Sequence, residues 1–243
     1  MTKIILKKKK VNGEYMIADF KTERPLTILP GQFLMLKNRT EPLLPKPFSV
    51  IESSKDSFKM LIRIVGRFTN YLKEAKAGEE FFCRGPYGNP FIDMIPKEKK
   101  VILIGGGCGG APVIHFSKVY KNRARKLILG FKTKAINKIL KDYDIIVEEE
   151  TGETVVDHLR KYLDGLKPEK KEQLTIISCG SLQMHKAIVE KVDFAGEIFL
   201  SLDERMGCGI GMCKGCPVKT RDGIKMVCRD GTLFNSKELL LEW

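Results

Sequence analysis

The pattern of hydrophobic and polar positions changes once along the chain, near residue 98. Before that point, short apolar runs of strand length are separated by turn residues such as Asn12-Gly13, Pro30-Gly31 and Gly78. The runs cover residues 14–20, 31–38, 47–53, 58–65 and 79–85, and a further strand is expected around Lys7 to Lys10. This pattern predicts a small antiparallel β-barrel or sandwich over residues 1–98.

Beyond residue 98, apolar runs alternate with helical stretches. The apolar runs lie at residues 100–107, 126–131, 143–150, 174–180 and 197–202, and helices are expected over residues 112–122, 155–163 and 182–192. Such alternation is typical of a parallel, doubly wound sheet, so residues 99–200 are predicted to form an α/β nucleotide domain. Residues 201–243 are rich in glycine and cysteine and show little periodicity, which is typical of a segment held together by a metal centre.

Composition narrows the functional classes. The formal net charge is +13, but the lysines are scattered and no aromatic stacking pattern accompanies them, so no nucleic-acid partner is expected. No apolar run approaches the roughly 18 residues of a membrane span, and no membrane association is expected. The start of the chain has no apolar leader, which favours the cytoplasm. In that reducing compartment, the 7 cysteines are expected to bind metal or pack rather than form disulfides.

A glycine-rich turn follows the first strand of the α/β region. In "VILIGGGCGGAP", Gly105, Gly107 and Gly110 satisfy the dinucleotide fingerprint, and Pro112 suits the first turn of a helix. Glycines allow close approach of a phosphate, and the helix N-terminus supplies positive potential. A glycine turn with a purely structural role is the alternative, but the strand-turn-helix context favours nucleotide binding.

A second glycine turn is expected at the same edge of the sheet. The strand that ends in "SCGSLQM" brings Cys179 and Gly180 to the carboxyl ends of the strands, where open α/β sheets bind ligands. For the thiol of Cys179 itself, packing under the turn is the favoured role, because a free cysteine usually behaves as a small apolar group.

Four cysteines near the C-terminus carry the most specific signal. Cys208, Cys213 and Cys216 follow the spacing C-x4-C-x2-C, and Cys228 comes after them. This is the spacing of plant-type [2Fe–2S] proteins, and the glycines of "MGCGIGMCKGC" let the loop fold closely around a cluster. Structural zinc is the competing hypothesis. It more often uses paired C-x2-C knuckles, so the spacing favours iron–sulfur.

A nucleotide site beside an iron–sulfur loop raises a problem of electron counting. Nicotinamide exchanges two electrons together as hydride, whereas a [2Fe–2S] cluster carries one electron at a time. A flavin is the usual device that connects the two, so the N-terminal barrel is expected to hold one.

Segments of the barrel resemble the flavin domain of the ferredoxin–NADP reductase superfamily. The segments are "PGQFLML", "KPFSV", "IRIVGRFTNYL" and "GPYGNPF"; in that superfamily an Arg-x-(Tyr/Phe)-Ser motif lines the flavin and a Gly-x-x-Thr turn meets its pyrophosphate. The resemblance implies FAD binding by Lys46, Pro47, Phe48, Ser49, Leu61, Ile62, Arg63, Gly66, Phe68 and Thr69. Lys46 replaces the usual arginine, and Phe68 stands where glycine usually precedes the threonine.

The order of flavin barrel, nucleotide domain and cysteine loop narrows this resemblance. "SLDERMGCGIGMCKGC" and "VCRDGTLFNSKEL" are similar to the electron-transfer subunits of NAD-dependent dihydroorotate dehydrogenases. The resemblance implies FAD, a [2Fe–2S] cluster and NAD as cofactors. It also implies a partner, an FMN-containing catalytic subunit of dihydroorotate dehydrogenase, in a heterotetramer of two copies of each. Met206, Ile210 and Met212 are candidate contacts for that partner, with packing onto the chain's own domain as the alternative.

Three further questions stay open at the level of sequence. Reductase subunits of sulfhydrogenases and of NADH-dependent ferredoxin–NADP reductases share the same domain order. A zinc-stabilised nucleotide-binding regulator without redox activity is a hypothesis from a different class. No acidic residue clearly follows the second strand of the α/β region, where Lys132 and Lys134 are placed to meet a 2′-phosphate, so the choice between NAD and NADP is also open.

Overall fold

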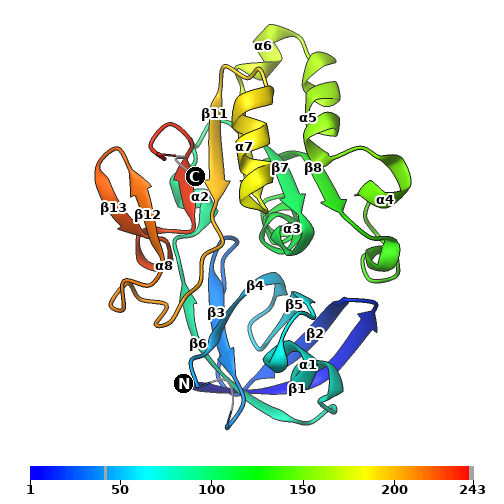
Figure 1. Cartoon of the computed structure of the whole chain (residues 1–243), viewed down its shortest axis with the longest axis vertical. Coiled ribbons are helices and arrows are strands. Elements are labelled where there is room, and N and C mark those ends of the chain that lie inside the picture. The colour runs from blue at the N-terminus through cyan, green and yellow to red at the C-terminus, as the bar shows by residue number, and fades with distance from the viewer. Residues whose placement is uncertain (41–42, 241–243) are drawn as a thin grey trace.

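The N-terminal segment forms a closed six-stranded barrel in the order β1-β2-β5-β4-β3-β6 (Figure 1). The computed structural model describes residues 1–40 and 43–240, so the last three residues of the predicted segment 201–243 lie outside it. The barrel strands are β1 (Thr2–Asn12), β2 (Tyr15–Thr22), β3 (Phe33–Lys37), β4 (Lys46–Ser53), β5 (Ser57–Arg63) and β6 (Glu80–Tyr87), with helix α1 (Arg67–Glu74) between β5 and β6. The predicted antiparallel barrel is confirmed.

Successive side chains of a barrel strand point to opposite faces, one toward the barrel core and the other toward the next domain. In β2, Met16, Ala18 and Phe20 fill the barrel, whereas Tyr15 and Ile17 belong to a different core. That second core lies between the barrel and the nucleotide sheet. The same strand therefore stabilises the barrel with one face and positions the two domains with the other.

The second domain is a six-stranded sheet in the order β14-β11-β10-β7-β8-β9. Its strands are β7 (Lys100–Gly106), β8 (Ala124–Phe131), β9 (Ile145–Val147), β10 (Leu174–Cys179), β11 (Glu197–Ser201) and β14 (Leu233–Asn235). All neighbouring strands pair in parallel except β14, which runs antiparallel to β11. The predicted parallel sheet is confirmed, and the cysteine-rich segment adds an antiparallel edge strand that its sequence pattern does not predict.

Helices cover both faces of the sheet. The α-helices are α2 (Phe91–Met94), α3 (Gly110–Val119), α4 (Glu148–Thr151), α5 (Val155–Asp164), α6 (Pro168–Lys171) and α7 (Leu182–Lys191), and the short 3-10 turns are η1 (Gly107–Gly109) and η2 (Lys134–Lys138). Helix α3 packs with Val101 and Leu103 on one face, while α5 and α7 pack with Ile102 and Ile104 on the other. Helix α3 begins earlier than the sequence pattern predicts, because the turn that precedes it is already helical.

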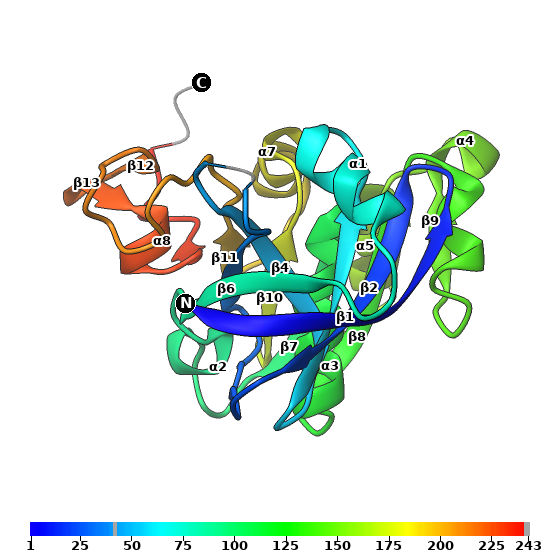
Figure 2. The same cartoon turned by 90° about the horizontal axis from the view of Figure 1, so that it is seen from below.

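The cysteine-rich segment contains the hairpin β12 (Pro217–Thr220) and β13 (Gly223–Met226), followed by α8 (Val227–Asp230). It lies beside β11 and β6, on the side of the molecule opposite to α4 (Figures 1 and 2). Its apolar residues, including Val218, Met226 and Val227, join the core on the α5 and α7 face of the sheet. No helix in residues 1–40 or 43–240 has the length and apolarity to cross a membrane.

Side chains of the barrel contact the nucleotide domain directly. The Tyr15 and Phe131 rings meet edge-to-face with centroids 5.4 Å apart. Ser53 Oγ lies 3.1 Å from His115 Nε2, and Lys118 of α3 forms an ion pair with Glu52 of β4. These contacts hold the two domains on either side of a shared cavity.

Candidate functional site

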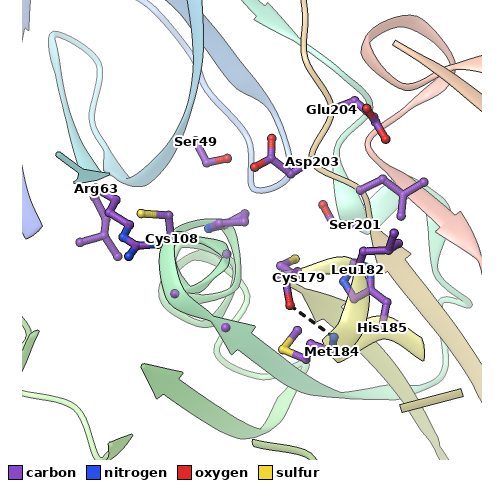
Figure 3. A pocket seen from close by; sticks show the side chains of 18 of the residues that line it. Ser49, Arg63, Cys108, Cys179, Leu182, Met184, His185, Ser201, Asp203 and Glu204 are labelled. Atoms are coloured by element: carbon purple, nitrogen blue, oxygen red, sulfur yellow. Dashed lines mark hydrogen bonds between the residues drawn. The ribbon is translucent and has the colours of Figure 1, made fainter. Parts of the chain in front are cut away.

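A cavity of about 1780 Å³ lies between the barrel, the carboxyl ends of the nucleotide strands and the cysteine-rich segment. Small-molecule sites usually have volumes of about 300–1,000 Å³, so this cavity has room for more than one organic ligand. Figure 3 shows Ser49 and Arg63 from the barrel near the same space as Cys108 and Cys179 from the nucleotide domain and Asp203 from the start of the cysteine-rich segment.

The barrel wall of the cavity contains every barrel residue that the resemblance implicates. It is formed by β4, the end of β5 and the start of α1, through Lys46, Pro47, Phe48, Ser49, Leu61, Ile62, Arg63, Gly66, Phe68 and Thr69. These residues come together because β4 and β5 are antiparallel neighbours in the barrel. Arg67, which the sequence comparison did not single out, also lines this wall, so Lys46, Arg63 and Arg67 bring positive charge to it.

The turn before α1 is tied together by one hydroxyl. The N–H groups of Val65 and Gly66 each donate to Thr69 Oγ1 at 3.0 Å, and that hydroxyl donates to the Gly66 carbonyl at 3.0 Å. The proton of Thr69 is thus used within the turn and not offered to a ligand. A Cβ built on Gly66 would meet no heavy atom within 4 Å, so its open side leaves room for a ligand to approach.

Two glycine turns form the nucleotide side of the cavity, one after β7 and one after β10. A Cβ on Gly109 would lie 2.2 Å from the Cys179 carbonyl oxygen, and one on Gly106 would lie 2.6 Å from the Met184 sulfur. The two turns touch because Cys179 pairs with Gly105 in the sheet. The sequence motif does not include Gly106 or Gly109, because the atoms that crowd them come from a distant part of the chain.

The fingerprint glycines divide into two roles. Gly107 lines the cavity and has φ +57°, a left-handed conformation that glycine adopts readily. Gly105 and Gly110 are not on the cavity wall and instead pack against each other, since a Cβ on Gly105 would lie 2.7 Å from Gly110 Cα. Together they let the β7 strand, the turn and α3 pack closely enough to form the site.

The thiols and the carboxyl group at the centre of the cavity are uncharged or shifted toward the uncharged form by burial. Burial raises the pKa of Cys179 to about 12, although the neighbouring Ser201 hydroxyl opposes the shift. Burial likewise raises the pKa of Cys108 to about 12. The pKa of Asp203, just after β11, is also raised by desolvation, although its side chain stays exposed on the cavity wall. Neither thiol is therefore a nucleophile at neutral pH, which supports a packing role for Cys179.

The four cysteines of the C-terminal segment lie in two pairs. Cys216 Sγ and Cys228 Sγ are 3.3 Å apart. Cys213 contacts Cys208 Sγ through its thiol and through its backbone N–H, which lies 3.4 Å from that sulfur. Within residues 1–40 and 43–240, no three His, Cys, Asp or Glu side chains are arranged to hold a single metal ion. The donors instead form two adjacent thiol pairs.

The backbone of the cysteine loop supports these sulfurs. The N–H of Gly211 donates to Cys228 Sγ at 3.0 Å, and the N–H of Ile210 donates to Cys208 Sγ at 3.4 Å. Gly209 and Gly211 have φ +79° and +80°, and a Cβ at either position would collide with Tyr87 or Arg229. Backbone N–H groups that point at sulfur stabilise thiolates, so the loop fits an anionic metal–sulfur centre.

Exposure differs along the loop. Cys213 is exposed, as are Ile210 and Met212, with 44% and 78% of their surface accessible. Met206 is buried in the core that the loop shares with the nucleotide sheet. Met206, one of the three proposed partner contacts, therefore packs onto its own domain. The other two, Ile210 and Met212, are available to a partner.

Comparisons with known proteins match separate parts of the chain. Residues 3–91 match the family described as "Oxidoreductase FAD-binding domain". Residues 203–240 match the "Iron-sulfur cluster binding domain of dihydroorotate dehydrogenase B".

Relatives of similar length match most of the chain. A protein of Caldanaerobacter subterraneus subsp. tengcongensis is 34% identical over 220 residues, which cover 87% of each chain. One of Clostridium acetobutylicum is 31% identical over 219 residues, covering 88% of this chain and 87% of the relative. Both are named "Dihydroorotate dehydrogenase B (NAD(+)), electron transfer subunit".

Solved structures show the same arrangement. A structure of an NADH-dependent reduced ferredoxin–NADP oxidoreductase matches with TM-score 0.81 and 25% identity, covering 97% of this chain and 88% of that one. A ferredoxin reductase of carbazole 1,9a-dioxygenase matches with TM-score 0.60 and 20% identity over 79% of this chain and 66% of that one, which shows the fold alone.

Proposed function

The chain belongs to the family of the dihydroorotate dehydrogenase B electron transfer subunits, and from that premise we propose that it carries electrons between a dihydroorotate-oxidising catalytic subunit and NAD. It is an oxidoreductase subunit of pyrimidine biosynthesis. An FAD site and an iron–sulfur site in one chain, on either side of a nucleotide fold, are what such a relay requires. The described residues include no acid–base pair that we assign to dihydroorotate, so the substrate reaction belongs to the partner.

FAD would be held by the barrel wall of the cavity. When bound, it supplies the exchange between one-electron and two-electron transfer. Lys46, Arg63 and Arg67 line that wall and offset the charge of a diphosphate. The start of α1 adds N–H groups that have no acceptor within the helix, and the open side of Gly66 leaves room for the phosphates.

The cysteine loop would hold a [2Fe–2S] cluster through Cys208, Cys213, Cys216 and Cys228. A zinc ion needs four ligands around one point, whereas a binuclear cluster takes two thiolates at each iron. The two thiol pairs, Cys208 with Cys213 and Cys216 with Cys228, support the binuclear centre. The plant-type spacing of the four cysteines supports it independently.

NAD would bind across the two glycine turns. The turn Gly106–Gly109 and the N-terminus of α3 receive its pyrophosphate, and the Cys179–Gly180 turn closes the other side. The nicotinamide end then lies toward the barrel wall, because both walls line one cavity. The interdomain contacts between Tyr15 and Phe131 and between Lys118 and Glu52 hold the two walls of that cavity together.

The partner would be an FMN-containing catalytic subunit, in a complex of two copies of each chain that works in the cytoplasm. The exposed side of the cysteine loop supports a contact there, because a buried cluster exchanges electrons only with a centre that comes close. Ile210 and Met212 flank the exposed Cys213 and provide apolar contact area, which is enriched at the core of protein interfaces.

A second candidate function is the reductase subunit of a sulfhydrogenase or of an NADH-dependent ferredoxin–NADP reductase. The TM-score of 0.81 to a structure of the latter type favours it. The match of residues 203–240 to the iron–sulfur domain of dihydroorotate dehydrogenase B favours the first function, and this observation carries the proposal.

Co-expression with a dihydroorotate dehydrogenase from the same genome tests the proposal. The expected result is a stable brown-yellow complex that contains FAD and two irons per chain and reduces NAD with dihydroorotate. A colourless chain that contains zinc and releases no flavin would overturn the electron-transfer function. Co-purification with hydrogenase or ferredoxin-reductase subunits alone would leave the cofactors in place and establish the second function instead.

The variant Cys213→Ser separates the two redox sites. It should lose the cluster absorbance but keep FAD, because the loop and the barrel wall are different segments of chain. NADH-dependent reduction of a flavin-accepting dye should persist, while electron transfer to the partner should fall at least tenfold. Cys83→Ala, which removes a thiol buried in the barrel core, is the matched control and should keep the cluster. Equal retention of both activities in Cys213→Ser would exclude the cluster from the electron path.

A further inference from the structure

One end of the cavity carries a group of charged side chains beyond the glycine turns. Strands β8 and β9 are parallel neighbours, and Phe131 pairs with Val147. Lys132 and Glu148 follow directly, so they leave the sheet side by side at its carboxyl edge, and both line the cavity. Glu153, just before α5, lines the same end.

The carboxylates at this end of the cavity differ in the hydrogen-bond and ion-pair partners that they already have. Glu153 forms an ion pair with Lys161, and its carboxylate also lies 2.7 Å from His158 Nε2. Glu149 Oε1 accepts the backbone N–H of Lys134 at 2.6 Å and does not line the main cavity. Among the residues that the structure describes, no hydrogen bond or ion pair engages the carboxylate of Glu148. At this end of the cavity, Glu148 is thus an exposed acceptor that is still available to a ligand.

The order of the strands puts Glu148 where the adenosine half of a bound dinucleotide would lie. The glycine turn that receives the pyrophosphate follows β7, with β10 on one side and β8 and then β9 on the other. We assign the nicotinamide end to the part of the cavity between the end of β10 and the barrel, where Cys179 and Ser49 both line the wall. The other half of the ligand therefore extends past the end of β8 toward β9, where its ribose would meet Lys132 and Glu148.

We propose that Glu148, with Glu153 beside it, makes the site selective for a dinucleotide with a free 2′-hydroxyl over one with a 2′-phosphate. This inference rests on the proposed function. A carboxylate accepts hydrogen bonds from ribose hydroxyls, which supply the donors that it lacks. A 2′-phosphate at the same place would bring about two negative charges against Glu148 and could pair only with Lys132.

The carboxylate comes from a different strand than the fingerprint leads one to expect. In the fingerprint, the acidic residue lies about 20 residues after the glycines, at the end of the second strand. Here that strand ends at Phe131 and is followed by Lys132, whereas the acid follows the third strand as the first residue of α4. The parallel register of β8 and β9 brings Glu148 to the place that the missing acid would occupy.

Binding of ADP-ribose and of its 2′-phosphate to the FAD-containing chain tests this inference without any electron transfer. By isothermal titration, the wild-type chain should bind ADP-ribose at least one hundredfold more tightly than the 2′-phosphate. Glu148→Gln should reduce that preference about tenfold, mainly through tighter binding of the 2′-phosphate. Glu150→Gln removes the same charge two residues further along α4, at a position that does not line the main cavity, and should leave the preference unchanged.

The outcomes separate this inference from the proposed function. If both fragments bind but Glu148→Gln leaves their ratio as in the wild type, the assignment of Glu148 is overturned and the nucleotide site stands. If Glu150→Gln changes the ratio as much as Glu148→Gln does, the preference comes from the combined negative charge of Glu148, Glu149 and Glu150. A specific contact between Glu148 and the ribose is then refuted. If neither fragment binds, the nucleotide site of the proposed function fails together with this inference.

Discussion

Replacing Gly109 by alanine should push apart the two backbone turns that form the nucleotide site. Gly109 has φ −61° and ψ −13°, a conformation that alanine adopts without strain, so the effect of the substitution is purely steric. The new Cβ would lie 2.2 Å from the Cys179 carbonyl oxygen, 2.4 Å from its carbon and 2.7 Å from the Gly180 nitrogen, whereas ordinary contacts begin at 3.4 Å. The turns must separate by more than an ångström.

The size of the effect follows from what the new atom touches. Overpacking typically costs about 1–3 kcal/mol, and side chains usually relieve part of it by changing rotamer. Here every crowded atom is backbone at the end of β10, which is held by ladders to β7 and β11. We therefore expect a loss of about 3 kcal/mol in the free energy of unfolding. Losing one hydrogen bond to a charged phosphate, about 1.5–3 kcal/mol, would also weaken nucleotide binding roughly ten- to one-hundredfold.

Two neighbouring glycines provide matched controls. Gly107→Ala places its Cβ in open space but at φ +57°, so only conformational strain of about 1–2 kcal/mol is expected. Gly110→Ala, in the first turn of α3, meets side-chain atoms at 3.5 and 3.6 Å, which are ordinary contacts, so its stability should stay within about 1 kcal/mol of the wild type. Urea unfolding and titration with ADP-ribose measure both quantities. If Gly109→Ala is as stable as Gly110→Ala and binds ADP-ribose as tightly, the predicted steric clash does not occur.

Two further predictions concern the barrel turn and acid stability. Thr69→Ala removes the hydroxyl that holds Val65 and Gly66 in the turn, so FAD should bind the apo-protein about tenfold more weakly in a titration. Thr69→Ser should restore the affinity, and unchanged affinity in the alanine variant would contradict this prediction. Burial lowers the pKa of His185 to about 4, so the stability present above pH 6.5 should be lost as pH falls toward 4, by about 3 kcal/mol. His185→Leu should flatten this dependence in urea unfolding at pH 7 and pH 5, and a slope equal to that of the wild type would count against the burial argument.

The spacing of the cysteines was sufficient to indicate an iron–sulfur loop, because ligands of one centre lie close together in the chain. The left-handed glycines at 209 and 211 belong to the same short segment, so their role was also expected from composition. What the pattern did not predict is that this segment contributes β14 to the nucleotide sheet. Three residues of strand carry no periodicity of their own, and only pairing with β11 makes them a strand.

Site residues that belong to a recognisable sequence motif were predicted, and those whose role depends on contact with a distant segment were missed. The barrel residues from Lys46 to Thr69 sit on neighbouring strands and one turn, and all those named from the resemblance line the cavity. Gly109 was missed because a side chain at this position would collide with Cys179, which is distant in the sequence. Glu148 was missed because its place beside Lys132 follows from strand register and not from its distance in sequence.

The sequence by itself determined the elements and their chemistry: alternating runs that form a barrel, buried runs that form a parallel sheet, and closely spaced thiols that suit a metal. Each of these depends on local periodicity or on ligands within one loop. The tertiary structure decided which glycines must lack a side chain, which acid meets the cavity, and that Met206 is buried while Met212 is exposed. Those properties arise from contacts between segments that are distant in sequence, because steric exclusion and burial depend on which atoms are neighbours in space.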